Sequence, residues 1–322
     1  MDKIPSSKKI ELKPKFEEKY KKILGKEYKA FINCSFTYLT KCIRTNTLKI
    51  TVEELKTKLA KNWILTPIPW SKESFKIKPK KGKNYDIGNL KEHSLGYFYV
   101  QESASMLPAI ILDPKPGDKI LDMCAAPGSK TTQMAQYMKN KGILIANDLQ
   151  GSRLKALGIN LQRMGVKNTI ETQASGTRFR TKQFDKILVD APCSGTGTIR
   201  KSFKVLEMWS PNLVKQIAKQ QYSLLKAGFQ ALKKEGTLVY STCTLEPEEN
   251  EAVVSRLLNE FPEAKIQPIK LNIKRTKPIL EFENLEIRKE LENTLRINPQ
   301  DNDSEGFFIC KITKKWEGRR YT

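Results

Sequence analysis

The stretch from Lys119 to Thr131 constrains this chain more than any other part of its sequence. It reads KILDMCAAPGSKT: a short apolar run ends in an acid and passes through small residues into a helical pattern. A strand that turns tightly into a helix leaves the first N–H groups of the helix free for a ligand. Small residues let that ligand approach the backbone closely. The stretch therefore predicts a cofactor-binding turn in an α/β sheet.

Two common nucleotide-binding motifs do not fit this stretch. A phosphate-binding P-loop requires Gly-x-x-x-x-Gly-Lys-Ser/Thr, but Ser129 separates Gly128 from Lys130 and no glycine lies five positions before Gly128. The dinucleotide fingerprint Gly-x-Gly-x-x-Gly is also absent here. The stretch closely resembles the first motif of the Nop/Sun family of RNA cytosine-5 methyltransferases, which binds S-adenosylmethionine. That family usually has a second glycine where this chain has Ser129.

This resemblance implies that S-adenosylmethionine is the cofactor. The loop residues expected to bind it are Cys124, Ala125, Ala126, Pro127, Gly128, Ser129 and Lys130. Asp148 lies roughly 20 residues beyond the glycine, where an acid commonly holds the cofactor ribose. The family usually places another acid near the adenine, and this chain has Ser175 there, so we expect a lower cofactor affinity. Asp122 is expected to organise the loop.

After residue 108, short apolar runs alternate with helical patterns, as in a doubly wound α/β sheet. We expect strands at 119–124, 142–149, 169–175, 184–192, 237–243 and 306–312. We expect helices near 131–140, 152–164 and 211–234, and another that opens at Pro247. The fold class is therefore α/β, with a mostly parallel, Rossmann-like methyltransferase sheet. Residues 264–300 show no readable pattern.

The length of 322 residues suggests about two domains, and Pro114 and Pro116 mark a junction. We expect a smaller α+β RNA-binding region at 1–108 and the catalytic domain at 109–322. Residues 43–49 contain Arg-Thr-Asn-Thr, which is similar to an Arg-x-Asn-Thr signature in the N-terminal region of the family.

The N-terminal region contains several local patterns. Residues 14–31 space apolar side chains as a helix does, with lysines between them, which predicts one amphipathic helix with a basic outer face. Thr51 and Glu54 form a capping box that predicts a helix start. Residues 63–70 are apolar but contain two prolines, which predicts an edge strand or a loop. Residues 72–91 are rich in lysine and predict an exposed basic loop, either a nucleic-acid contact or a solvated surface.

The net charge of +23 is the strongest global signal. Residues 1–100 carry 23 Lys/Arg against 10 Asp/Glu, a net charge of +13. A positive charge of this size favours binding to a polyanion, either nucleic acid or an acidic membrane surface. The alternative is a lysine-rich proteome, which would raise the net charge without any binding role. Because much of the charge is concentrated in the first third of the chain, we favour nucleic acid as the partner.

The cysteines and the chain terminus bear on location and on metal chemistry. The first residues are polar and no run approaches the roughly 18 apolar residues that a membrane span needs. The six cysteines are scattered without a Cys-x-x-Cys pair, and His93 is the single histidine. We therefore expect a cytoplasmic protein with free thiols, no metal and no membrane partner. We also expect a monomer.

Two cysteines follow predicted strands, Cys193 in Asp-Ala-Pro-Cys and Cys243 in Ser-Thr-Cys-Thr. Cytosine C5 is too poor a nucleophile to take a methyl group unaided, and a thiolate that adds at C6 solves this problem. If the two strands are neighbours, both thiols reach the ligand-binding edge of the sheet. Free cysteine is also a common core residue, so each cysteine taken alone is weak evidence for a catalytic role.

The resemblance, and not the composition, assigns catalytic roles. It implies that Cys243 is the nucleophile and that Cys193 assists product release, whereas DNA cytosine-5 methyltransferases use the Pro-Cys cysteine as nucleophile. Asp190 would contact the cofactor and hydrogen-bond the target base. Lys130 would lie at the active site and steady Asp190 or lower the cysteine pKa.

The function predicted from these motifs is RNA cytosine-5 methylation, with tRNA favoured over rRNA as substrate. Two alternatives stay open: a catalytically inert RNA-binding assembly factor of the same fold, and a DNA cytosine-5 methyltransferase. Adenine and glutamine N-methyltransferases are disfavoured, because they typically carry Asn/Asp-Pro-Pro-Tyr where this chain has Asp-Ala-Pro-Cys.

Overall fold

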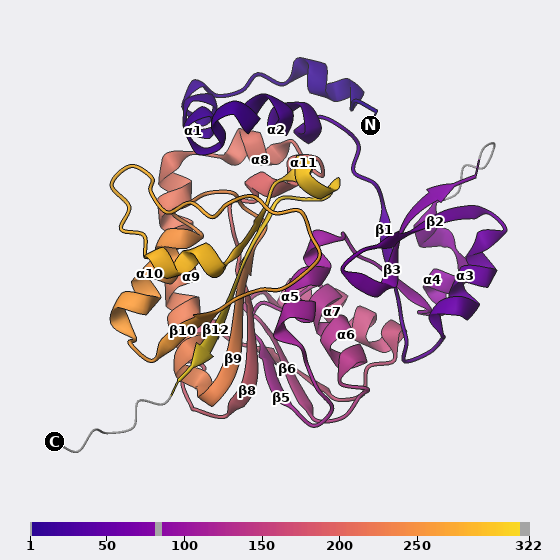
Figure 1. Cartoon of the computed structure of the whole chain (residues 1–322). Helices are drawn as coiled ribbons and strands as arrows, with labels where there is room; N and C mark the ends of the chain where they lie inside the picture. Colours follow the sequence, from indigo (N-terminus) through magenta and orange to yellow (C-terminus); the bar gives the residue numbers. More distant parts are fainter. Residues whose placement is uncertain (1, 81–85, 316–322) are drawn as a thin grey trace.

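The computed structural model describes residues 2–80 and 86–315, and these residues form two separate sheets (Figure 1). The large sheet has eight strands. Seven of them lie side by side in the order β10 (Ala264–Gln267), β12 (Phe307–Lys314), β9 (Leu232–Thr242), β8 (Phe184–Asp190), β5 (Lys119–Asp122), β6 (Ile143–Asp148) and β7 (Thr169–Gln173). The strands from β9 to β7 are parallel, whereas β12 runs antiparallel to β9 and also pairs with β10 and β11 (Leu295–Ile297). The prediction of a mostly parallel α/β sheet is confirmed.

Helices cover both faces of the large sheet. One face packs against α9 (Pro211–Ala231) and α10 (Glu251–Glu260), with Leu121, Val189 and Tyr240 in the shared core. The other face carries Ile120, Leu144 and Leu188 against the helices α5 (Leu107–Leu112) and α6 (Ser129–Tyr137). The alternation of Ile120 and Leu121 between the two cores is the period-2 pattern of a strand buried on both sides. α7 (Gly151–Met164) packs beside α6.

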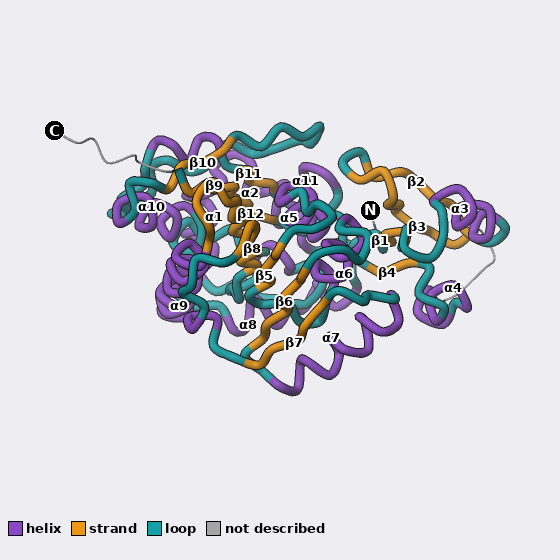
Figure 2. Tube along the Cα trace, turned by 90° about the horizontal axis from the view of Figure 1, so that it is seen from below, coloured by secondary structure: helices purple, strands orange, loops and turns teal. Residues whose placement is uncertain are grey.

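The small sheet is antiparallel, and its spatial order is β2 (Trp63–Ile68), β3 (Ser71–Pro79), β1 (Cys42–Thr45) and β4 (Phe98–Val100). Figure 2 shows it beside the large sheet, with α3 (Val52–Ala60) and α4 (Lys91–Ser94) on its outer side. The capping box at the start of α3 is present, since Thr51 accepts from Glu54 N and Glu54 accepts from Thr51 N. β2 is an edge strand, as the prolines predict.

Arg44 and Asn46 connect the small sheet to the helices α6 and α7. The buried Arg44 guanidinium donates to Gln101 Oε1, to Ser129 O (2.9 Å) and to Thr132 Oγ1 (2.9 Å). The Asn46 amide donates to Gly96 O and to Met164 O at the end of α7, both at 2.8 Å. The signature at 43–49 is therefore a joint between the two sheets.

The first helices pack around Trp209. The prediction of one helix at 14–31 is wrong, because Gly25 adopts a φ of +51° and a 3-10 turn separates α1 (Pro14–Leu24) from α2 (Tyr28–Ser35). Phe16, Tyr20 and Phe31 are buried with Trp209, which follows α8 (Lys204–Met208). Figure 1 shows α1 and α2 beside α8 and α11 (Pro299–Asn302).

Three further predictions need correction. Residues 72–79 are not a loop but most of β3, because Phe75 and Ile77 alternate inward between outward-facing lysines; residues 81–85 of that predicted loop lie outside the described residues. The helix predicted at 211–234 ends at Ala231, since Leu232 already pairs with β8. The helix predicted at Pro247 begins at Glu251, after a turn.

Candidate functional site

The loop between β5 and α6 forms one wall of the site. Gly128 adopts a φ of +104°, and a Cβ added there would lie 2.8 Å from Leu157 Cδ1, so only glycine fits this turn against α7. Asp122 is buried and accepts a hydrogen bond from the Thr131 hydroxyl at 2.7 Å. Burial, with a smaller contribution from Asp190, raises the pKa of Asp122 to about 7. Asp122 thus holds the loop against the first turn of α6.

Asp148 links this loop to the end of β6. Its Oδ2 accepts from Ala126 N at 3.2 Å and lies 3.3 Å from Arg153 Nη1, while its Oδ1 accepts from Gln150 N at 3.1 Å. Arg153 also donates to Ala126 O at 2.6 Å. The carboxylate is 3% exposed and is therefore fixed in place by these donors.

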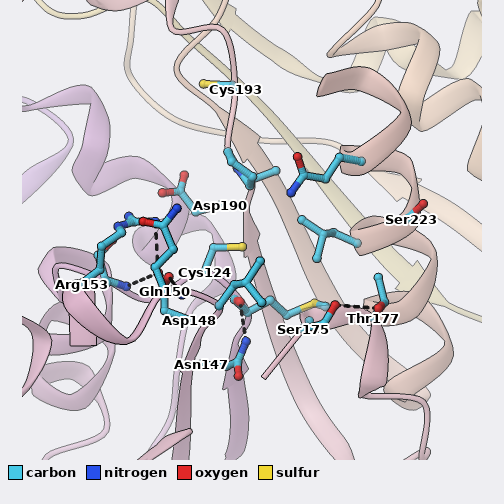
Figure 3. Close-up of a pocket in the computed structure, with 18 of the residues that line it drawn as sticks. Cys124, Asn147, Asp148, Gln150, Arg153, Ser175, Thr177, Asp190, Cys193 and Ser223 are labelled. Carbon is cyan, nitrogen blue, oxygen red and sulfur yellow. Dashed lines mark hydrogen bonds and ion pairs between the residues drawn. The ribbon is translucent and has the colours of Figure 1, made fainter. Parts of the chain in front are cut away.

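A cavity of about 420 Å³ opens between these loops and the ends of β7 and β8 (Figure 3). Among the residues expected to bind the cofactor, its lining includes Cys124, Ala126, Asp148, Ser175 and Asp190. Cys193, Cys243 and Arg153 line it as well. Apolar walls with a few fixed polar groups suit a nucleoside-sized ligand.

Ser175 stands where the resemblance expects an acid. Its hydroxyl is 2.8 Å from that of Thr177, and the two side chains lie at one end of the cavity (Figure 3). Asn147 fixes this end, because its amide donates to Met123 O at 3.1 Å and to Ala174 O at 3.0 Å.

The two candidate cysteines meet at the other end. Cys193 Sγ and Cys243 Sγ are 3.1 Å apart, because β8 and β9 are neighbours and their following loops converge. The hydrogen bond with Cys243 and the burial of Cys193 both raise the pKa of Cys193. Cys193 therefore keeps its proton at neutral pH, and its thiol shares a hydrogen bond with the Cys243 sulfur.

Lys130 and Asp190 form an ion pair beside these thiols. Lys130 Nζ lies 2.7 Å from Asp190 Oδ2 and 3.1 Å from Ser105 Oγ, while Ser241 donates to Asp190 Oδ1 at 2.7 Å. Burial lowers the pKa of Lys130, but the charges of Asp190 and Cys243 outweigh burial, so the pKa is raised. A permanent ammonium thus interacts with both Asp190 and Cys243.

A second cavity of about 580 Å³ lies between the small sheet and the same residues. Six residues line both cavities: Cys124, Ala126, Arg153, Asp190, Ala191 and Cys243. Four residues that the resemblance assigned to the cofactor, namely Ala125, Pro127, Ser129 and Lys130, line only this second cavity, and Gly128 lines neither. The structure therefore places Cys243 and Asp190 in a wall shared by two adjoining cavities.

Sequence reasoning missed two charged residues of this region. Arg153 carries no motif, because its role depends on α7 lying beside the loop. Glu249 accepts from Ser194 N (3.0 Å) and Gln221 Nε2 (2.8 Å), and burial raises its pKa to about 7. The Glu-rich sequence after Pro247 predicted only the start of a helix. In the structure Glu249 of this sequence also holds the loop that carries Cys193, through Ser194 N.

Within residues 2–80 and 86–315, no helix is both long and apolar enough to cross a membrane, and no group of three or more His, Cys, Asp or Glu side chains could hold a metal ion.

Comparisons with known proteins agree with this geometry. Residues 109–313 match the family described as 16S rRNA methyltransferase RsmB/F, and residues 12–103 match the N-terminal domain of 16S rRNA methyltransferase RsmF. The tRNA (cytosine(49)-C(5))-methyltransferase of Pyrococcus abyssi is 46% identical over 93% of this chain and 96% of its own length.

Two further relatives are similar to this chain over most of its length. The ribosomal RNA small subunit methyltransferase F of Erwinia tasmaniensis is 41% identical over 94% of this chain, which spans only 63% of that relative. The crystal structure of NSun6 from Pyrococcus horikoshii with SFG, an analogue of S-adenosylmethionine, has a TM-score of 0.80 and 26% identity over 95% of this chain and 99% of that one. The chain belongs to the RsmB/F, or Nop/Sun, family of S-adenosylmethionine-dependent RNA cytosine-5 methyltransferases.

Proposed function

We propose that this chain methylates C5 of a cytosine in tRNA through a covalent adduct between Cys243 and C6. The observation that carries the proposal is the pair of thiols 3.1 Å apart beside the Lys130–Asp190 ion pair, in the wall shared by the two cavities. The first cavity would hold S-adenosylmethionine, and the second would hold the target cytosine. A cytosine in a helix would have to leave its stack to enter it.

S-adenosylmethionine supplies the methyl group when it is bound. Cys124, Ala126, Asp148 and Ser175 would hold the cofactor, because they line the first cavity. The pairing of Asp148 with Ala126 N and Arg153 fixes the position of its carboxylate, which can accept hydrogen bonds from the hydroxyl groups of a ribose.

Cys243 would be the nucleophile. Cys193 keeps its proton and could donate a hydrogen bond to a Cys243 thiolate, and the Lys130 ammonium interacts with Cys243 and would stabilise that thiolate. The thiolate adds to C6, the electron density gained at C5 accepts the methyl group, and loss of the C5 proton then allows elimination of Cys243. Cys193 would assist this last step, because its sulfur is in contact with that of Cys243.

Asp190 would orient the base. Its carboxylate is held by Lys130 and Ser241 and lines the second cavity, where it can accept a hydrogen bond from the exocyclic amine of cytosine. The intact set of Cys193, Cys243, Asp190 and Lys130 favours an active enzyme over an inert binding factor.

The choice of tRNA over rRNA rests on sequence similarity. The archaeal tRNA methyltransferase is 46% identical over 93% of this chain, whereas the Erwinia rRNA methyltransferase is 41% identical over 94% of it. We also propose that the enzyme works as a monomer in the cytoplasm, where a reducing environment keeps the six free cysteines as thiols.

Covalent trapping tests the assignment of the cysteines. With S-adenosylmethionine and tRNA, Cys193→Ala is expected to accumulate a protein–RNA adduct that survives denaturing electrophoresis, because elimination of Cys243 is blocked. Cys243→Ala is expected to form none. Cys34→Ala, at a buried free cysteine that lines neither cavity, is the control and is expected to behave as wild type. An adduct with Cys243→Ala but not with Cys193→Ala would reverse the two roles.

A further inference from the structure

Two carboxyl groups, Glu102 and Glu305, share the wall of the second cavity with Cys243 and Asp190. They come from distant parts of the chain, one just after β4 and the other just before β12. Glu305 N donates to Glu102 Oε1 at 3.2 Å, so the two segments are in direct contact. The proposed function uses neither group.

Glu102 accepts hydrogen bonds on both of its carboxylate oxygens. Its Oε1 accepts from the Ser103 hydroxyl (2.7 Å) as well as from Glu305 N, and its Oε2 accepts from Ala104 N (2.7 Å) and Ser105 N (3.1 Å). These four donors fix the side chain of Glu102 and occupy both of its oxygens.

Glu305 has the opposite environment. It is 5% exposed, and its Oε1 is buried without a hydrogen-bond partner. Burial and the negative charge of Glu102 raise the pKa of Glu305 to about 7, although Lys201, Lys130 and Arg200 act in the other direction. Arg200 is itself paired with Asp303 at 2.8 Å. Glu305 is therefore about half protonated near pH 7 and largely protonated below it, and in the protonated form it offers an O–H donor to the cavity.

The donors and acceptors of this cavity complement cytosine. The pairing edge of cytosine carries one donor, the exocyclic amine, and two acceptors, N3 and O2. Asp190 is an acceptor, and the protonated Glu305 is a donor. Resting on the proposed function, we propose that Glu305 binds the target cytosine by donating a hydrogen bond to an acceptor atom on its pairing edge.

Such a bond would act on the reaction as well as on binding. When the Cys243 thiolate adds to C6, negative charge develops on the C2–N3 side of the ring. A donor fixed there binds the adduct more strongly than the free base. No proton needs to be transferred, so the later loss of the C5 proton is unaffected.

The test compares kcat/KM for methyl transfer in wild type and in Glu305→Gln between pH 6 and 9. The amide has nearly the same shape, keeps a donor and does not titrate, while cysteine ionisation affects both proteins alike. The ratio of wild type to variant is expected to fall about tenfold as the pH rises through about 7, the size of one lost hydrogen bond with a charge left behind. Glu305→Ala is expected to lose about tenfold or more at pH 6.5.

Two further variants sharpen the result. Glu102→Gln removes the neighbouring charge, so the fall in its activity relative to Glu305→Gln is expected at a lower pH than in wild type. Glu207→Gln, an exposed acid, is the control and is expected to follow wild type. A ratio that is flat with pH, together with full activity of Glu305→Ala, would overturn the inference while leaving the proposed function intact. Absence of 5-methylcytidine from wild-type reactions would overturn both.

Discussion

Replacing Arg44 by methionine is expected to lower both the free energy of unfolding and the affinity for the cofactor, although Arg44 lines neither cavity. The Arg44 side chain is fully buried and donates to Gln101, Ser129 and Thr132. Burial lowers its pKa to about 10, which still leaves it charged at neutral pH. Ser129 is the first residue of α6, so Arg44 connects the small sheet to the helix that follows the cofactor loop.

The magnitude follows from the acceptors that methionine would leave. Thr132 keeps a second partner, since its hydroxyl also donates to Ser129 O at 3.1 Å, whereas Gln101 Oε1 loses a charged donor. Ser129 O likewise keeps the Thr132 hydroxyl as a donor, so one buried acceptor, Gln101 Oε1, is left unpaired. Such an acceptor costs about 1–3 kcal/mol, which predicts a loss of about 1–3 kcal/mol in unfolding free energy. We expect the displaced loop to weaken cofactor binding by at least about tenfold, roughly 1.4 kcal/mol.

Urea unfolding and calorimetric titration with S-adenosylhomocysteine measure the two effects. Arg163→Met is the matched control, because Arg163 lies at the same joint, donates to His93 O at 3.1 Å and stacks on Tyr99 without touching the cofactor loop. It is expected to lose stability but to keep its cofactor affinity. Unchanged cofactor affinity in Arg44→Met, or an equal loss in Arg163→Met, would refute the idea that Arg44 positions the loop.

Three other predictions concern the cofactor, pH and salt. Ser175→Asp supplies the acid that the family usually has, and S-adenosylhomocysteine is expected to bind several-fold more tightly by calorimetry; weaker binding would show that the adenine does not lie there. Because burial raises the pKa of Glu249 from 4.5 to about 7, the folded protein retains a proton that the unfolded chain releases, so this contribution to stability is present below pH 4.5 and lost as the pH rises to 7. Wild type is therefore expected to lose about 3 kcal/mol more unfolding free energy than Glu249→Gln between pH 4.5 and 7.5, and equal slopes in denaturant titrations would contradict this. Raising the salt from 50 to 200 mM is expected to weaken tRNA binding more than tenfold by fluorescence anisotropy, and an insensitive affinity would argue against lysine–phosphate contacts.

The ends of the parallel strands were predictable from the sequence. Asp148, Asp190 and Cys243 each end or follow an apolar run, and the ends of parallel strands must meet at one edge of the sheet. The meeting of Cys193 with Cys243 needed only the adjacency of β8 and β9.

Contacts between distant segments were not predictable in this way. The contact of Glu305 with Glu102 depends on how the segment before β12 meets the segment after β4, and no local sequence pattern predicts it. β3 was missed because Phe75 and Ile77 stand among lysines, so composition hid a period-2 pattern. The break at Gly25 was missed because the apolar residues on its two sides, as far as Phe31, keep an almost continuous helical spacing in the sequence.

Labelled-methyl transfer from S-adenosylmethionine to separated, unmodified tRNA and rRNA, followed by digestion to nucleosides, tests the central claim most directly. We predict label in 5-methylcytidine from the tRNA fraction and its loss in Cys243→Ala. Label confined to rRNA would contradict the proposed substrate. Label in another nucleoside, or none in either RNA while the RNA still binds, would contradict the proposed chemistry.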